Sequence, residues 1–337
     1  MKAAMVKEFG RPLVVGMTSD PVLRGPNDAL VRVHASGVCH TDLHAASGDW
    51  PVKPGLPFIP GHEGVGVVEA IGDAVTHIKI GDRVGVPWLH SACGHCGYCL
   101  AGWETLCLAQ QNTGYSVNGG FAELVVADAR YVGLIPDGLA FEDVAPHFCA
   151  GVTTYKAVKV SGAGPQHTVL ISGLGGLGHM ALQYAKVAGA RIIAVDVNEE
   201  KLALAKKLGA DETIDARAQD VARTVQKLGG ADIAIASAVS ARAFRSAFDA
   251  LKRGGKLVIV GLPPEELPIP IFDLVLKGIS VIGSIVGTRK DLEETLVLAA
   301  RGRVSCNHTM AALEDINDVF AQMKAGQIEG RVVLRLG

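Results

Sequence analysis

Four cysteines lie close together in the sequence, and their spacing is that of a metal site. Cys93, Cys96, Cys99 and Cys107 form the pattern C-x2-C-x2-C-x7-C. Four thiolates at such short spacing suit tetrahedral zinc, and a shell filled by protein ligands leaves no position for a substrate. The pattern predicts a structural zinc site, with an iron–sulfur cluster as the alternative because C-x2-C-x2-C runs also hold such clusters. His95 inside the loop is a possible ligand that four thiolates do not need.

A glycine-rich stretch predicts a dinucleotide site. Gly173, Gly175 and Gly178 match G-x-G-x-x-G, with Gly176 and Leu177 before the last glycine. The first glycine permits a tight turn, the second lets the backbone approach a pyrophosphate, and the third lets a helix pack closely on the sheet. The start of the following helix offers unpaired N–H groups to the anion.

An acidic residue stands where this fingerprint needs one. Asp196 closes the next apolar run, about 20 residues beyond the glycines. Its carboxylate can accept hydrogen bonds from ribose hydroxyls and would repel a 2′-phosphate, so the sequence favours NAD over NADP. Lys201, early in the next predicted helix, is a candidate contact to the same ribose, with an exposed helix lysine as the competing interpretation.

The two halves of the chain have different patterns. Residues up to about 150 contain Val- and Ile-rich runs, such as 29–35 and 64–71, bounded by turn residues, which predicts a β-rich domain. Beyond about residue 165, apolar runs alternate with helical patterns, which predicts βαβ units and a doubly wound parallel sheet. The apolar runs are 168–172, 191–196, 213–215, 231–236, 256–261 and 280–283.

Composition and charge limit the class of protein. The 337 residues suit about two domains, and 49% apolar with 20% charged residues is globular composition. The net charge of −2 argues against a nucleic-acid partner or an anionic membrane surface. No run is apolar enough for a membrane span, and the charged start lacks the apolar core of a signal peptide. We therefore expect a cytoplasmic protein without a membrane partner.

A second set of residues is of types that bind metals, but its spacing does not by itself define a metal site. Cys39 and the pair His62 and Glu63 lie too far apart for spacing alone to define a site. Cysteine, histidine and an open position describe a catalytic zinc, whereas a lone cysteine or histidine is more often an ordinary buried or surface residue. The residues alone leave both interpretations open.

The sequence resembles the zinc-containing medium-chain alcohol dehydrogenases over essentially its whole length. The likeness rests on Gly61-His62-Glu63-Gly64-Val65-Gly66, followed by Gly72 and Val75, and on the four-cysteine loop and glycine fingerprint in the family's order. The stretches 48–51 and 149–155 resemble the bacterial and yeast-like branch that acts on ethanol or propanol.

The resemblance implies an α/β fold of two domains. A β-rich GroES-like catalytic domain would comprise residues 1–152, carry the structural zinc lobe at 90–110 and be completed by 288–337. Residues 153–287 would form the NAD-binding Rossmann domain. Bacterial members are usually homotetramers, and the predicted strand edge near 280–285 is a candidate subunit contact.

The resemblance also implies a catalytic zinc, and thus two zinc ions per chain. Its ligands would be Cys39, His62 and Cys149, the last of which nothing else in the sequence distinguishes. Glu63 would be the acid beside the metal, able to enter its shell. Thr41 would hydrogen-bond the substrate oxygen.

Further roles follow from the same likeness. His44 would end a proton relay that runs through the nicotinamide ribose, and His40 and Arg331 would contact the cofactor pyrophosphate. Trp50 and Trp88 would line the substrate pocket, and the competing interpretation is that both pack in the core. Two other metal-ligand types, Cys306 and His147, match no role in the family.

The implied reaction is the reversible oxidation of short primary alcohols to aldehydes, with hydride transfer to NAD⁺. A dehydrogenase for polyols or bulky secondary alcohols is the alternative, because two tryptophans argue only weakly against large substrates. A zinc- and nucleotide-binding protein without alcohol chemistry is a third possibility, since fold alone does not establish activity.

Overall fold

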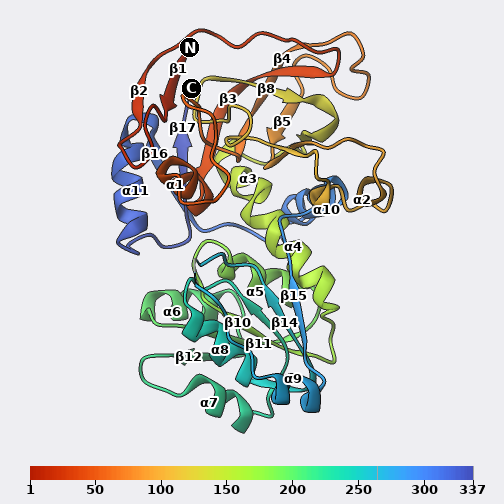
Figure 1. The fold of residues 1–337 in the computed structure, drawn as a ribbon, viewed down its shortest axis with the longest axis vertical. Coiled ribbons are helices and arrows are strands. Elements are labelled where there is room, and N and C mark those ends of the chain that lie inside the picture. The colour runs from red at the N-terminus through yellow and green to blue at the C-terminus, as the bar shows by residue number, and fades with distance from the viewer. Residues whose placement is uncertain (264, 337) are drawn as a thin grey trace. The chain divides into compact units, whose positions relative to one another are not determined.

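The computed structural model describes residues 1–263 and 265–336, and the chain divides into two compact units (Figure 1). The first unit comprises residues 1–152, 287–302 and 306–337, and the second comprises residues 153–286 and 303–305. Among the described residues, no helix combines the length and apolar character needed to cross a membrane.

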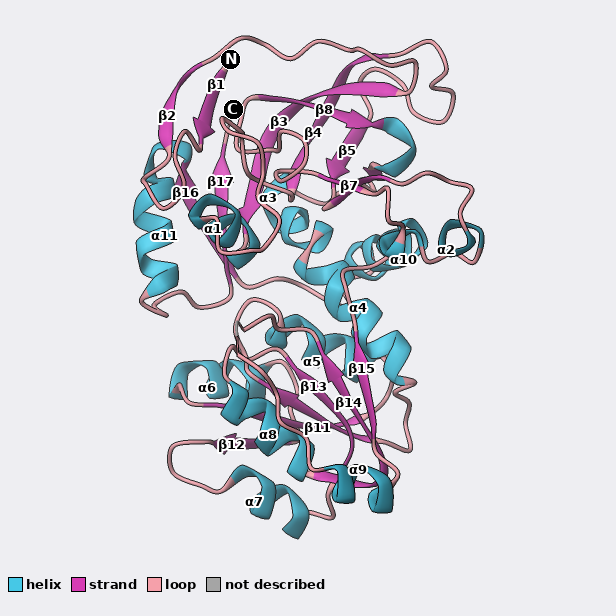
Figure 2. Cartoon of the chain, in the orientation of Figure 1, coloured by secondary structure: helices cyan, strands magenta, loops and turns pink. Residues whose placement is uncertain are grey.

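The second unit is built around a six-stranded sheet in which every pair of neighbours is parallel. The strand order is β12-β11-β10-β13-β14-β15, and Figure 1 and Figure 2 together label these strands. The strands are β10 (Thr168–Ser172), β11 (Arg191–Asp196), β12 (Glu212–Asp215), β13 (Ala231–Ala236), β14 (Leu251–Ile259) and β15 (Ser280–Gly283). This order belongs to doubly wound dinucleotide-binding sheets, in which the direction of winding reverses between the first and fourth strands. The predicted parallel α/β sheet is therefore confirmed.

Helices cover the strands of this sheet. They are α5 (Gly178–Val187), α6 (Glu199–Lys207), α7 (Val221–Lys227), α8 (Ala241–Asp249) and α9 (Ile271–Lys277), while α4 (Ala150–Ser161) contains the boundary between the units. Helix α5 contacts β10 and β11, and α8 contacts β10, β13 and β14. Since both faces are covered, the central strands are almost wholly apolar and buried.

The first unit is built around a mainly antiparallel sheet with the path β16-β17-β3-β4-β5-β9, and β8 pairs with β3 off that path. Only the pair β16 and β17 is parallel among the pairs of this sheet in the described residues. Its strands are β3 (Asp28–Val38), β4 (Gly64–Ile71), β5 (Arg83–Val86), β8 (Leu124–Asp128), β9 (Gly133–Leu134), β16 (His308–Ala312) and β17 (Arg331–Arg335). Two smaller pairs are β1 (Lys2–Met5) with β2 (Val14–Met17), and β6 (Leu89–Ser91) with β7 (Gln111–Asn112).

Short helices and buried aromatic side chains complete the first unit. The helices are α1 (His40–Ser47), α2 (Gly97–Leu100), α3 (Phe141–Val144), α10 (Arg289–Ala300) and α11 (Ile316–Lys324). Phe148 is completely buried in a cluster with Leu292 and Leu296 of α10. A Cβ atom at Gly85 would overlap the Phe148 ring, so the absence of a side chain there makes room for it. This packing fixes the chain immediately before Cys149.

Candidate active site

Four buried side chains from separate parts of the chain meet in the first unit. Cys39, His62, Glu63 and Cys149 each contribute one potential ligand atom, and these atoms lie within 4.8 Å of one another. The two sulfur atoms are 3.9 Å apart, and His62 Nε2 lies 3.3 Å from Cys149 Sγ. The structure thus brings together the three residues expected as catalytic zinc ligands and the acid expected beside them.

The antiparallel pairing of β3 and β4 explains half of this convergence. Ser36 of β3 lies opposite Gly64 of β4, so the residues that follow β3 and those that precede β4 meet at one end of the ladder. Cys39 follows β3 directly, and His62 and Glu63 precede β4.

Asp42 holds Cys39 and His62 together, and sequence reasoning did not single it out. Its Oδ2 accepts a hydrogen bond from Cys39 N at 2.9 Å, and its Oδ1 accepts from Gly61 N at 3.0 Å and His62 Nδ1 at 2.8 Å. Because an ionised carboxylate only accepts, His62 carries its proton on Nδ1 and presents Nε2 to the cluster. The signal available was an acid in the first turn of a helix, three residues after the capping position.

The charges in the cluster favour a thiolate. The hydrogen bond with Cys149, together with the nearby charges of Arg331 and His62, holds the pKa of Cys39 well below its usual value despite burial. Burial opposes charge on His62, but Asp42 and Cys39 outweigh it and raise the pKa of His62 to about 10. Thiolate is the form of cysteine that ligates metals.

Glu63 belongs to this cluster and has one unsatisfied carboxylate oxygen. Its Oε1 accepts a hydrogen bond from Arg331 Nη2, and both side chains are buried. Its Oε2 is buried with no partner among the described residues, and a Cβ atom at Gly37 would overlap it. A buried charged oxygen without a partner is costly, and a neighbouring cation removes that cost. Two thiols, an imidazole and this carboxylate therefore fit a zinc ion.

Three aromatic rings pack together, and one of them, Trp88, contacts the cluster. Trp88 packs edge-on against His62 with ring centroids 5.2 Å apart, and Trp50 packs edge-on against Trp88 at 6.2 Å. Tyr115 lies 5.4 Å from Trp50 and 5.7 Å from Trp88. The structure places Trp88 against the cluster and Trp50 against Trp88, and it adds a tyrosine that nothing in the sequence pointed to.

Helix α1 carries the residues expected to handle the substrate proton. Thr41 and His44 are three residues apart on this helix, so their side chains lie on one face. His44 Nδ1 lies 2.9 Å from Asp49 Oδ2, which as a carboxylate can only accept, so Nε2 is the basic atom of His44. The His44 ring also stacks on Trp50 at 6.0 Å, while His40 at the start of the helix is exposed.

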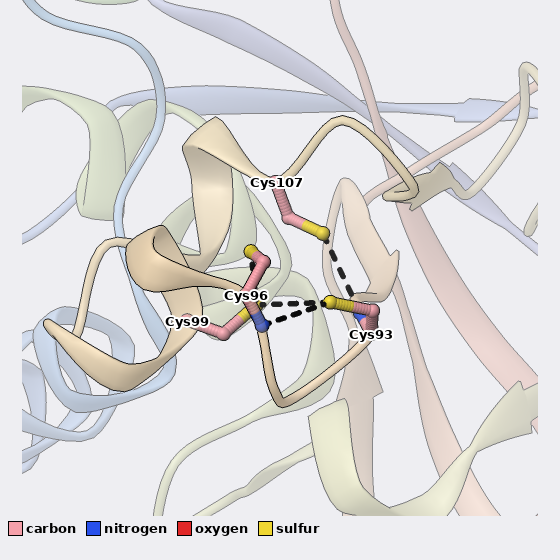
Figure 3. Close-up of side chains that lie close together, drawn as sticks. All are labelled: Cys93, Cys96, Cys99 and Cys107. Atoms are coloured by element: carbon pink, nitrogen blue, oxygen red, sulfur yellow. Dashed lines mark hydrogen bonds between the residues drawn. The ribbon is translucent and has the colours of Figure 1, made fainter.

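The four-cysteine loop forms a second cluster. Its side chains converge from the segment between β6 and β7 (Figure 3), with Cys93 Sγ 3.9 Å and Cys96 Sγ 3.6 Å from Cys99 Sγ, and all four sulfur atoms, including that of Cys107, lie within 4.8 Å of one another. Hydrogen bonds from the backbone N–H groups of His95 and Cys96 lower the pKa of Cys93 to about 6, whereas burial raises the pKa of Cys99 to about 12. Four thiols and no other donor fit a closed zinc site. The ring of His95 instead bonds the Cys93 carbonyl oxygen through Nδ1 at 2.8 Å.

The glycine turn of the second unit joins β10 to α5. Gly173 has φ +90°, a conformation suited to glycine, and a Cβ atom at Gly178 would overlap the Gly173 carbonyl oxygen. A Cβ atom at Gly175 would meet nothing within 4 Å, so the backbone there is open to a ligand. Gly176 and Leu177 complete the turn ahead of the helix.

Asp196 closes β11 beside this turn. Its Oδ2 accepts from Leu174 N at 2.6 Å, and its Oδ1 accepts from Val197 N at 2.8 Å and Asn198 N at 3.0 Å. The Asn198 side chain caps α6 through the backbone N–H of Lys201. Asp196, the residue predicted to bind the ribose, therefore also holds the backbone at 174 and at 197–198 in place.

Comparisons with known proteins agree with this geometry. The family description "Alcohol dehydrogenase GroES-like domain" matches residues 25–137, and "Zinc-binding dehydrogenase" matches residues 176–301. The chain is 59% identical over 337 residues, all of both chains, to an alcohol dehydrogenase of Geobacillus stearothermophilus. The crystal structure of an alcohol dehydrogenase from Aeropyrum pernix matches with a TM-score of 0.93 and 37% identity, covering 99% of this chain and 100% of that one. A structure described as an NAD-dependent alcohol dehydrogenase matches with a TM-score of 0.93 and 30% identity over 100% of both chains.

Proposed function

The chain belongs to the zinc-binding alcohol dehydrogenase family with a GroES-like domain, and we propose that it interconverts short primary alcohols and aldehydes. The observation that carries this proposal is the buried cluster of Cys39, His62 and Cys149 beside a wall of aromatic rings. Two cysteines and one histidine are the catalytic zinc set that alcohol dehydrogenase itself exemplifies. Bulky rings next to such a set favour a small substrate.

We assign the catalytic zinc to Cys39, His62 and Cys149, with Glu63 as an occasional ligand through its unpartnered Oε2. The four cysteines of the loop at 93–107 would hold a second, structural zinc. When bound at the catalytic site, zinc supplies a Lewis acid that makes the hydroxyl proton of an alcohol easier to lose.

The chain's own residues orient the substrate and move its proton. Thr41 holds the substrate hydroxyl, and the proton passes outward to Nε2 of His44, whose Nδ1–H is held by Asp49. Asp42 keeps the imidazole of His62 in the tautomer that presents Nε2. Trp50 and Trp88 exclude water from the reacting atoms.

The cofactors of this family member are zinc and NAD, and we assign the NAD site to the second unit, with the first unit as the catalytic domain. The turn from Gly173 to Gly178 would hold the pyrophosphate, and Asp196 and Lys201 the adenosine ribose.

We propose that the protein is a homotetramer whose subunits meet through the outer strand of the parallel sheet. Strand β15 pairs only with β14 among the described strands. Nearby, α9 exposes Ile271, Phe272 and Val275 by 77%, 74% and 67%, an apolar surface that a second copy would bury. Size measurement by light scattering tests this, since Phe272→Glu would dissociate the assembly.

A cytoplasmic location fits the cysteines. All seven are without disulfide bonds, and the two clusters need thiolates to bind zinc. Reducing compartments keep such thiols available.

The experiment that tests the proposed function is NADH formation by the purified protein with NAD⁺ and a panel of alcohols. Ethanol to hexanol, isopropanol and sorbitol cover the alternatives. We expect the highest turnover with short primary alcohols. A preference for sorbitol or bulky secondary alcohols would replace the substrate class, and no turnover by protein with bound zinc and NAD⁺ would overturn the enzymatic assignment.

A further inference from the structure

Residues 112–121, which we call the strap, lie directly over the backbone that precedes His62. Gly119 N donates to Ile59 O at 2.7 Å, Gly120 N to Gly61 O at 2.8 Å, and Phe121 N to Pro60 O at 3.0 Å. The two backbones are so close that a Cβ atom at Gly114 would lie 2.8 Å from Gly61 N. The strap, residues 112–121, is therefore held rigidly against the turn that carries a metal ligand.

Tyr115 projects from this strap into the aromatic wall. The strap is held again where Thr113 N donates to Trp88 O at 2.9 Å, so the strap and Trp88 are fixed to each other. The Tyr115 ring contacts both tryptophans, and burial raises the pKa of its phenol, which keeps the hydroxyl protonated as a donor.

The hydroxyl of Tyr115 reaches the loop that carries Trp50. It donates to the carbonyl oxygen of Val52, whose side chain is 75% exposed. For residues 50–55, no other hydrogen bond occurs within the described part of the chain, and the remaining polar contact is Lys53 over the ring of Phe9 at 5.4 Å. Tyr115 therefore touches Trp50 through its ring and holds the Trp50 loop through its hydroxyl.

We propose that Tyr115 is a positioning residue that sets the size of alcohol the site accepts. By joining the rigid strap to the loop at 50–55, it fixes Trp50 against Trp88 and so fixes the width of the wall beside His62. This inference rests on the proposed function and adds a specificity determinant to it. Without the Tyr115 hydrogen bond, the loop at 50–55 can move and carry Trp50 outward. The site then admits longer alcohols and binds ethanol more weakly.

The test compares Tyr115→Phe, which removes only the hydroxyl, with Tyr115→Ala, which also removes the ring. We expect Tyr115→Phe to raise KM for ethanol about threefold to tenfold with little change in kcat, since one hydrogen bond is lost. Tyr115→Ala should raise it about tenfold or more and shift the highest kcat/KM toward pentanol or hexanol. Steady-state kinetics from ethanol to hexanol measures both effects.

Tyr131→Phe is the matched control. The Tyr131 hydroxyl also donates to a backbone carbonyl in the first unit, that of Ala92 at 3.2 Å, but it lies outside the aromatic wall. Its loss should lower thermal stability without changing the order of preference among alcohols. A shift in that order in Tyr131→Phe equal to that in Tyr115→Phe would assign the effect to general destabilisation and overturn the proposal.

Quenching of tryptophan fluorescence by acrylamide tests the loop without any turnover. Tyr115→Phe should raise the quenching constant because Trp50 becomes more accessible, and Tyr131→Phe should not. If the wild-type protein oxidises no alcohol, the proposed function fails, and quenching alone then decides whether Tyr115 holds the loop. Unchanged quenching together with an unchanged chain-length profile would overturn the proposal.

Discussion

The two cysteine clusters of the first unit are assembled in different ways. The lobe cluster draws four ligands from one segment, residues 93–107, and three of its four cysteines are only half-buried. The other cluster consists of Cys39, His62, Glu63 and Cys149, and we call it the catalytic cluster after the role that we propose for it. It draws its members from three separate stretches, and all of them are buried. Two residues outside this cluster form hydrogen bonds to its members: Asp42 to His62, and Arg331 to Glu63.

This difference separates a local site from one that depends on the whole unit. The lobe cluster is complete once one loop has closed, and its four thiols leave no room for a substrate. The catalytic cluster exists only when β3, β4 and the turn before Cys149 are all in place. We expect substitutions in the catalytic cluster to affect chemistry and those in the lobe to affect stability.

The sharpest test of this contrast is Cys149→Ala. Loss of one catalytic ligand should lower kcat by about a thousandfold or more, because a Lewis acid contributes several kcal/mol to the reaction. Cys306→Ala is the matched control, since Cys306 is a half-buried thiol outside both clusters. Steady-state kinetics and zinc content measure the effect, and equal losses in both variants would refute the assignment.

Asp42→Asn tests the outer partners of the catalytic cluster. An amide has one acceptor oxygen, so the three N–H groups that now face the carboxylate cannot all be satisfied. We expect zinc affinity or kcat to fall by about 10-fold to 100-fold. Asp291→Asn is the control, because Asp291 is equally buried but caps α10. It should lower the melting temperature and spare kcat, and the opposite pattern would contradict the role of Asp42.

The contrast also explains what could be predicted from the sequence. The four-cysteine site could be predicted because its ligands are neighbours in the chain. The glycine turn could be predicted because Asp196 follows its glycines at the spacing that the fingerprint requires. Cys149 could not be found by spacing, since tertiary packing of Phe148 brings it to the cluster. Tyr115 was missed for the same reason, because only the crossing of the strap over Gly61 places it near Trp88.

The helix and strand boundaries deviate where glycine is involved. The sequence predicts a helix that follows the glycine stretch, and α5 begins only at the last of these glycines, Gly178, because the preceding residues form the turn. It predicts a strand from Lys256, but β14 begins at Leu251 and continues through Gly254, at φ +75°. Gly254 and Gly255 therefore lie at a bend within this strand.

A smaller effect is expected for His44→Ala, at the solvent side of the catalytic cluster. His44 is 30% exposed and hydrogen-bonded to Asp49, so its loss removes an outlet for the substrate proton and leaves the ligands intact. Turnover should fall by about 10-fold at low pH, less than the roughly 100-fold or more typical of a general base, because water can still accept the proton. The fall should be smaller at high pH, where solvent hydroxide accepts the proton. Zinc content should stay unchanged. A pH–rate profile identical to that of the wild type would exclude the relay.

Cys96→Ala in the lobe should have the smallest effect on chemistry. A three-thiol set holds zinc poorly, so one of two zinc ions should be lost and the melting temperature should fall by several degrees, about 2–4 °C per kcal/mol. The rest of the unit keeps its own contacts. Glu104 in the lobe is buried and pairs with Arg289 of α10 at 2.9 Å, a link that needs no metal.

Because that link remains, kcat of the folded Cys96→Ala protein should stay within about twofold of the wild type, the range of ordinary surface changes. Zinc analysis, thermal unfolding and kinetics on the same sample separate the outcomes. If kcat instead fell as far as in Cys149→Ala while the protein remained folded, the lobe would be shaping the catalytic cluster. The two sites would then form one cooperative structure, and the local character inferred from the spacing of the four cysteines would be wrong.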